Sequence, residues 1–413
     1  MNYPLFLARR LSLGEGRRVS PAVTVAIIAV AISVAVMIAS IAIVLGFKKE
    51  ITEKVVGFNG HISLFRVPNS EEDDNLISIN PFLQSILEEM PFITEYTPQA
   101  SIPAILKTED DFKGVYLRGL KGKNLTEYIE KNLESGEVPD YNEEESKNRI
   151  IISRIAANQL RLDTGDRIDT YFISDDVRVR RLEISGIYNS HFDQYDDVMI
   201  FGAMPLVEQL GNLPEQTGTY IMLQTDDFEK VPEYTAVLQE EINRAVAYGE
   251  TDSYYRTDNV LSQGRGFFSW LSLLDTNVVV IIILMMVVGC VTLVSGMMII
   301  ILEKKKFIGL MRALGAPANK IRSVFIYLAV RISFIGILIG DLIILGLLYA
   351  QATYHFMVLD PDSYYIDFVP VFLPGWIVVA LNAGVLFVTY LVLVLPSRFV
   401  GKISPVESMV RSE

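Results

Sequence analysis

The residue types that most often carry chemistry are sparse in this sequence. His61, His191 and His355 are too far apart for a metal-ligand spacing such as H-x-x-x-H, and the single cysteine, Cys290, permits no disulfide within the chain. No G-x-S-x-G motif occurs. The carboxylates of HFDQYDD (191–197) could bind calcium, but the EF-hand spacing is absent and a loop between strands is the simpler interpretation. We therefore predict no metal site and no catalytic residue on this chain.

A nucleotide-binding motif is also missing from the sequence. The phosphate-cradling motif G-x-x-x-x-G-K-[ST] does not occur. Two Gly-Lys pairs, Gly122-Lys123 and Gly401-Lys402, lack both the upstream glycine and the following Ser or Thr. The chain is thus expected to hold no cofactor. If it serves active transport, ATP and magnesium must be bound by a partner chain.

One segment has the features of a coupling element to such a partner. The charged stretch Glu303–Lys306 follows a long apolar run, and Gly315-Ala316-Pro317 has the composition of a helix end. Between them, apolar residues recur at helical spacing and predict one apolar face, made of Phe307, Ile308, Leu310, Met311 and Leu314. An amphipathic helix of this kind can insert into a groove of a partner protein. An interfacial helix that only anchors the loop is the open alternative.

Four long apolar runs must position this segment: residues 21–46, 278–302, 323–350 and 371–395. Each exceeds the roughly 20 residues that an α-helix needs to cross a bilayer. The first run is too long for a signal-peptide core and is followed by no cleavage site, so we expect an uncleaved anchor. The predicted fold is an α-helical membrane protein with four transmembrane helices and an α+β extracytoplasmic domain inserted between helices 1 and 2.

Loop charges predict the orientation. Residues 1–20 and 303–322 are rich in Lys and Arg, whereas residues 47–274 contain 22 Lys and Arg against 40 Asp and Glu. Positive loops remain in the cytoplasm. The predicted order is a cytoplasmic segment 1–20, helix 1 at 21–46, a periplasmic domain 47–274, helix 2 at 275–302, a cytoplasmic coupling helix and loop 303–322, helix 3 at 323–350, a short periplasmic loop 351–370, helix 4 at 371–395 and a cytoplasmic tail 396–413.

The outer domain shows mixed patterns. GHISLFRV (60–67) alternates as a strand does, and the acidic stretch 71–74 predicts a solvated loop. Two strand-like stretches flank Glu109–Asp111 and predict a hairpin, while residues 230–248 predict an amphipathic helix. These patterns favour helices separated from an antiparallel sheet.

The third apolar run carries two glycines and two charges. Gly336 and Gly340 form G-x-x-x-G, and we predict that they pack against a neighbouring helix of the same chain rather than at a dimer seam. Arg331 and Asp341 lie about 15 Å apart along a helix, too far to form a pair. We expect Arg331 to reach the cytoplasmic headgroups and Asp341 to face outer water. An interhelical or subunit contact and a proton pathway are the alternatives.

The coupling segment resembles the signature of the FtsX/MacB-like permease superfamily of ABC transporters, roughly E-[KR]-x-x-x-I-G-x-x-[KR]-A-x-G-A followed by spaced Ile, Phe and Gly. The matching residues here are Glu303, Lys304, Ile308, Gly309, Arg312, Ala313, Gly315, Ala316, Ile321, Phe325, Gly336 and Gly340. The C-terminal PSRFVGKISPVESMV resembles the closing motif of that superfamily, with matches at Pro396, Val400, Ile403, Pro405, Val406, Glu407 and Ser408.

Within the superfamily the chain looks most like the LolC/LolE lipoprotein-releasing permeases, and the resemblance covers nearly the whole length. Its N-terminal block matches at Gly46, Phe47, Glu50, Ile51, Gly57, His61 and Ile62. Tyr327 stands where the family often has a small or polar residue. The loop by which one family member recruits its periplasmic carrier has no match here.

The resemblance implies a permease subunit in the bacterial inner membrane that extracts lipoproteins for delivery to the outer membrane. Its partners would be a cytoplasmic ABC ATPase, a second permease subunit in a homodimer or heterodimer, the lipoprotein, and possibly a periplasmic carrier. The net charge of −13, which belongs to the outer domain, implies no nucleic-acid partner. The expected ATPase-coupling residues are Glu303, Lys304, Ile308, Gly309, Leu310, Arg312, Ala313, Gly315 and Ala316.

Acyl chains need an apolar pocket without directional bonds, and methionine adapts to irregular shapes. The resemblance implies a substrate cavity between helices 1 and 2. The residues expected to line it are Val34, Met37, Ile38, Ile41, Val44, Met285 and Met286. Alternative functions are a MacB-type peptide or drug exporter and a mechanotransmission subunit that drives a periplasmic partner. A sensor without an ATPase fits the segment around Gly315 less well.

Overall fold

The computed structural model describes residues 21–397 apart from 69–74, 142, 174–176 and 365. The predicted segment 1–20, the acidic loop 71–74 and the tail motif beyond residue 397 lie outside the described residues. The chain divides into two compact units. The helical unit comprises described residues within 21–49, 270–358 and 368–397, and the outer unit comprises 50–269 and 359–367.

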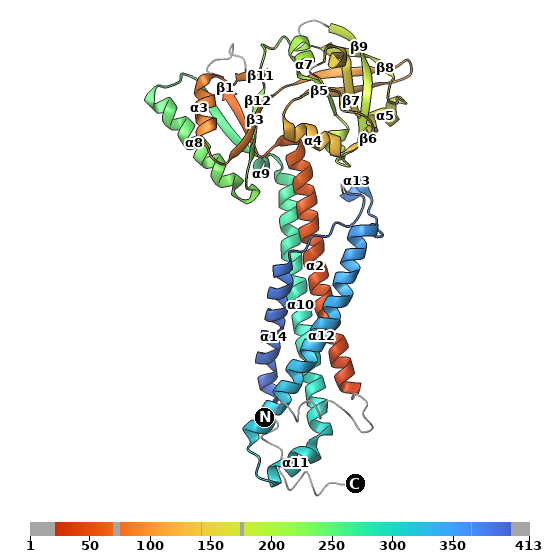
Figure 1. Cartoon of the computed structure of the whole chain (residues 1–413), viewed down its shortest axis with the longest axis vertical. Coiled ribbons are helices and arrows are strands. Elements are labelled where there is room, and N and C mark those ends of the chain that lie inside the picture. The colour runs from red at the N-terminus through yellow and green to blue at the C-terminus, as the bar shows by residue number, and fades with distance from the viewer. Residues whose placement is uncertain (1–20, 69–74, 142, 174–176, 365, 398–413) are drawn as a thin grey trace. The chain divides into compact units, whose positions relative to one another are not determined.

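Long helices dominate the helical unit (Figure 1). Among the described residues, four helices are long and apolar enough to cross a membrane: α2 (Pro21–Asn59), α10 (Arg265–Glu303), α12 (Ala318–Tyr354) and α14 (Gly375–Ser397). A short helix, α11 (Lys305–Ala313), follows α10, and α13 (Pro361–Tyr364) lies in the loop between α12 and α14. Their shared core includes Val34, Met37, Met297, Phe325, Leu328 and Leu393.

The first helix is longer than its apolar run. It continues past Gly46 to Asn59, so its 39 residues span about 58 Å, against roughly 30 Å of hydrocarbon. Gly46 lies within the helix and lets the backbone of Pro370 pack closely against it. A Cβ at position 46 would lie 2.3 Å from the carbonyl oxygen of Pro370. Helix α10 likewise begins at Arg265, before the predicted span.

One lobe of the outer unit is a four-stranded antiparallel sheet in the order β13-β1-β12-β3, formed by Tyr254–Asn259, Ile62–Val67, Tyr220–Thr225 and Ile93–Gln99. Helices α3 (Pro81–Glu89) and α8 (Val231–Tyr248) cover one face of it through a core that includes Leu64, Leu83, Leu223 and Leu238 (Figure 1). Asn80 caps α3 by accepting from the Leu83 N–H at 2.8 Å. Small elements complete this lobe: β2 (Ile77–Ser78), β11 (Thr217–Gly218), η2 (Phe228–Lys230) and α9 (Val260–Gln263).

The other lobe is built on a sheet in the order β6-β9-β7-β10-β5-β4-β8. The strands are β4 (Ser101–Lys107), β5 (Phe112–Leu120), β6 (Leu133–Gly136), β7 (Arg149–Ser153), β8 (Arg167–Ile173), β9 (Val177–Tyr188) and β10 (Met199–Ala203). The long strand β9 pairs with β8 through Val177–Glu183 and with β7 through Glu183–Tyr188, which closes the sheet into a barrel. Helices α4 (Lys123–Lys131), α5 (Arg154–Leu160), α6 (Asp193–Asp196), α7 (Met204–Leu210) and η1 (Glu144–Asn148) connect the strands.

The predicted hairpin at Glu109–Asp111 is confirmed, since β4 and β5 pair antiparallel across it, and the helix predicted for 230–248 is α8. The expectation of an antiparallel sheet was wrong for this lobe. Strand β10 pairs parallel with β5, and β7 pairs parallel with β9. Alternation along a strand reveals its buried face but not the direction of its partner.

Candidate functional site

The segment predicted to couple to an ATPase forms α11, directly after α10 ends at Glu303. Ile308 is fully buried in the core of the helical unit, and Gly309 is buried beside it. Leu310 and Leu314 are 50% and 75% exposed. The single apolar face expected from the sequence is therefore divided. One side anchors α11 to the helices, and the other presents leucines to the outside.

A Schellman turn ends α11. Gly315 adopts the left-handed conformation with φ of 85°, which glycine reaches without steric cost. Its N–H donates to the Arg312 carbonyl, and the Ala316 N–H donates to the Met311 carbonyl, both at 3.0 Å. The turn fixes the position of Leu314, the C-cap residue of α11. Pro317 then precedes α12.

The other predicted coupling residues surround this exposed side. Glu303, Ala313 and Gly315 are exposed, whereas Lys304 and Arg312 are half-buried. Exposed leucines flanked by cationic side chains suit insertion into a partner groove whose rim is acidic.

Gly336 and Gly340 bring α12 against α2. A Cβ at position 336 would lie 2.8 Å from the Val30 Cβ, and one at position 340 would lie 2.6 Å from the Ala31 carbonyl oxygen. Both glycines thus face a helix of the same chain at a distance that any side chain would obstruct.

The predicted substrate residues are only partly gathered. Val34, Met37, Met285 and Met286 line one cavity of about 20 Å³ together with residues of α14. Ile38 is buried in the core of the helical unit, while Ile41 and Val44 are half-buried and are not among the residues of this cavity. Ligand pockets usually have about 300–1,000 Å³. In this conformation the space between α2 and α10 is closed to an acyl chain.

The two charges of α12 differ in their surroundings. Arg331 is exposed on the helix surface. Asp341 accepts a hydrogen bond from Asn382 Nδ2 of α14 at 2.7 Å. The contact between helices, named above as an alternative, is therefore found in place of the expected orientation toward outer water. The sequence signal that could have suggested this pair is Asn382 itself, a polar residue inside an apolar run.

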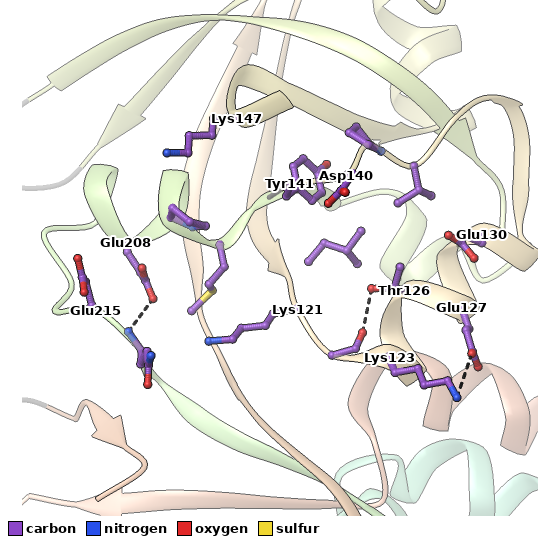
Figure 2. A pocket seen from close by; sticks show the side chains of 17 residues that line it. Lys121, Lys123, Thr126, Glu127, Glu130, Asp140, Tyr141, Lys147, Glu208 and Glu215 are labelled. Carbon is purple, nitrogen blue, oxygen red and sulfur yellow. Dashed lines mark hydrogen bonds and ion pairs between the residues drawn. The ribbon is translucent and has the colours of Figure 1, made fainter. Parts of the chain in front are cut away.

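The outer unit contains a groove of about 880 Å³ between α4, the loop 137–147 and α7 (Figure 2). Its lining combines apolar residues, among them Leu120, Pro139 and Met204, with three lysines and five carboxylates. The Tyr141 hydroxyl is buried with no hydrogen-bond partner among the described residues, and burial raises its pKa. No described His or Cys lines the groove.

The Gly122-Lys123 pair opens α4 but forms no phosphate site. The Glu95 carboxylate already accepts from the Lys123 N–H at 2.6 Å and from the Asn124 N–H at 3.2 Å (the Lys123 side chain points to Glu127 in Figure 2). These two N–H groups of the helix N-terminus are therefore not available to a phosphate.

The histidines have structural partners. His61 Nδ1 accepts from the Thr225 N–H at 2.8 Å, and burial lowers the pKa of His61. His355 ends α12 in the left-handed conformation, and its ring lies 3.9 Å from that of Phe368. Within the described residues, no group of three or more His, Cys, Asp or Glu could hold a metal ion.

The HFDQYDD stretch, considered above for calcium, forms a turn and α6. The Asp196 carboxylate accepts from the Ser190 hydroxyl at 2.6 Å and the Ser190 N–H at 2.9 Å. Burial raises the pKa of Asp196, and these hydrogen bonds and the Lys54 charge oppose that shift. Asp196 is therefore a structural residue that holds a turn.

Comparison with known proteins agrees with this arrangement. Residues 23–241 match the model of the MacB-like periplasmic core domain, and residues 279–405 match the FtsX-like permease C-terminal model. A lipoprotein-releasing system transmembrane protein LolE from Haemophilus influenzae is 22% identical over 98% of this chain and 99% of its own length.

Two solved structures also match part of this chain. The extracellular domain of the noncanonic ABC-type transporter YknZ from Gram-positive bacteria covers 48% of this chain and 99% of its own, with 14% identity and a TM-score of 0.34. A domain of a putative permease from Porphyromonas gingivalis covers 48% of this chain and 90% of its own, with 14% identity and a TM-score of 0.27. The two family models together span both units, and the chain therefore belongs to the FtsX/MacB-like family of ABC transporter permeases.

Proposed function

We propose that this chain is the permease subunit of an ABC transporter that extracts lipoproteins from the inner membrane for delivery to the outer membrane. The observation that carries the transporter role is α11, anchored by buried Ile308 and presenting Leu310 and Leu314. The LolE relative, similar over nearly the full length of both chains, supports the lipoprotein substrate.

Energy comes from a partner. A separate cytoplasmic ATPase binds ATP and magnesium and receives the exposed side of α11 in a surface groove. This requires α11 and both termini to lie in the cytoplasm and the outer unit in the periplasm, as the loop charges favour. Two permease subunits, identical or closely related, then engage two ATPase copies.

The lipid moiety enters between α2 and α10. Val34, Met37, Met285 and Met286 already line one small cavity there. The flexible thioethers of the three methionines and the apolar surface of all four residues suit acyl chains. Since the cavity holds only about 20 Å³, substrate entry requires the helices to separate, and closure expels the substrate.

A periplasmic carrier would receive the product at the barrel. On the outward face of β4, β5, β8 and β9 the register aligns Tyr116 with Pro103 and Val179 with Tyr171. Phe112, Tyr116, Val177 and Val179 are between 46% and 67% exposed. Exposed apolar side chains on one face of a sheet are the kind of surface that suits an interaction site.

Purification from the native membrane tests the proposal. We expect the chain to copurify with an ABC ATPase and with triacylated peptides, detected by mass spectrometry, and the peptides to be lost after incubation with ATP and magnesium. A complex with the ATPase that carries no lipopeptide but binds peptides or drugs would favour the exporter. An ATPase complex that moves no substrate would favour mechanotransmission.

A further inference from the structure

The loop between α12 and α14 belongs to two units. Its central residues 359–367, here named the strap, have their contacts in the outer unit, whereas both flanking helices belong to the helical unit. The chain also passes between the units within α2 and within α10. The strap is thus joined covalently to the helical unit at both ends, and only noncovalent contacts hold it in the outer unit.

The base of the loop is fixed to the last turns of α12. Gln351 is 2% exposed, and its Nε2 donates to the carbonyls of Val369 at 3.0 Å and Met357 at 3.3 Å. Its Oε1 accepts from the Met357 N–H at 2.9 Å. Above this base the Leu359 N–H donates to the Asp367 carbonyl at 2.7 Å, so the strap begins and ends as a closed hairpin. Movement of α12 therefore moves both ends of the strap together.

The far side of the strap is held by the barrel lobe. Asp367 Oδ2 lies 2.8 Å from His191 Nε2, with side chains that are 41% and 32% exposed. Ile366, the residue before Asp367, is 2% exposed. The residue that contacts His191 and a buried apolar side chain are therefore adjacent on the strap.

The turn that carries His191 is itself fixed. Lys54 Nζ, near the end of α2, donates to the Ser190 carbonyl at 2.6 Å, and Asp196 binds the Ser190 N–H and hydroxyl. The Phe192 ring lies 6.4 Å from Phe58 of α2. His191 adopts a left-handed φ of 52° between these anchors, so its imidazole has a defined position.

We propose that His191 and Asp367 are positioning residues of the transport cycle. They clamp the strap to the turn 189–196, so that a displacement of α12 driven from α11 reaches the barrel lobe as well as passing along α2 and α10. The transport part of this inference rests on the proposed function, whereas the clamp itself does not.

Hydrogen–deuterium exchange on the purified full-length chain tests the clamp without substrate. His191→Asn keeps a residue that tolerates a left-handed φ. His191→Asn and Asp367→Asn, each made singly, should speed exchange in 357–369 about two- to fivefold, the range for a half-exposed polar contact. Ile366→Ala should speed it more than roughly tenfold, as for loss of a buried side chain. The exchanged pair His191→Asp with Asp367→His should restore slow exchange. Asp360→Asn, which alters only the contact with Ser363 inside the strap, is the matched control.

Exchange in 357–369 that is the same in the wild type, His191→Asn and Asp367→Asn would overturn the clamp. In the reconstituted complex with its ATPase, a non-hydrolysable ATP analogue should change exchange in 189–196 more in the wild type and the exchanged pair than in the single variants, which keep only the route along α2 and α10. A nucleotide response of equal size in the single variants and the wild type would overturn the transmission role. Failure of any ATPase to bind would count against the proposed function, and the clamp would still be judged by the first measurement.

Discussion

Gly340→Ala tests the packing of α12 on α2. A Cβ at this position would lie 2.6 Å from the Ala31 carbonyl oxygen and 3.2 Å from its Cα. Both atoms are backbone, so no side-chain rotation relieves the contact and the two helices must separate locally. Overpacking of this kind costs about 1–3 kcal/mol. The better helix propensity of alanine returns about 1 kcal/mol.

Gly346→Ala is the matched control on the same helix, because a Cβ there meets nothing within 4 Å. It gains the same propensity term without the packing cost, so the two variants should differ by about 1–3 kcal/mol in free energy of unfolding. The measurement is unfolding of the purified chain in mixed micelles with increasing dodecyl sulfate, followed by circular dichroism. Equal stabilities of the two variants would refute close packing at Gly340.

Three further predictions follow from single contacts. Burial lowers the pKa of His61 below its ordinary 6.5, so the folded state binds fewer protons at this residue than the unfolded state does. The contribution of His61 to stability is therefore present above pH 6.5 and is lost as the pH falls below that value. His61→Gln should flatten that part of the decline in melting temperature between pH 7.5 and 5.5, and an unchanged slope would argue against the assignment. Val179→Asp on the barrel should weaken transfer to a carrier without changing ATP hydrolysis, whereas Val237→Asp on α8 should leave both transfer and ATP hydrolysis unchanged. Equal effects of the two substitutions on transfer would exclude the barrel face as the docking site of the carrier. Gly315→Leu should reduce substrate release per ATP because its φ of 85° costs a side chain about 1–2 kcal/mol, and undiminished release would contradict a coupling role.

The features that local sequence determines were predictable. Apolar residues all around the helix identify α2, α10, α12 and α14, and Gly315 followed by Pro317 identifies the end of α11. Both signals depend on residues close in sequence.

Long-range features were not predictable. Closure of the barrel requires Val177–Glu183 to pair with β8 while the rest of β9 pairs with β7, and alternation does not encode that choice. The division of the α11 face depends on which leucines the other helices cover. The strap depends on Asp367 meeting His191, far away in sequence and unmarked by any motif.

The most direct test of the account is ATP-dependent lipoprotein release from proteoliposomes that contain this chain, its second permease subunit and its ATPase. A triacylated lipoprotein should move to a soluble carrier when ATP and magnesium are added. Leu310→Asp with Leu314→Asp should abolish release while the subunits remain in the membrane, because these exposed leucines of α11 are the proposed contact with the ATPase. Release that requires no ATP, or that is unaffected by the double substitution, would contradict the central claim.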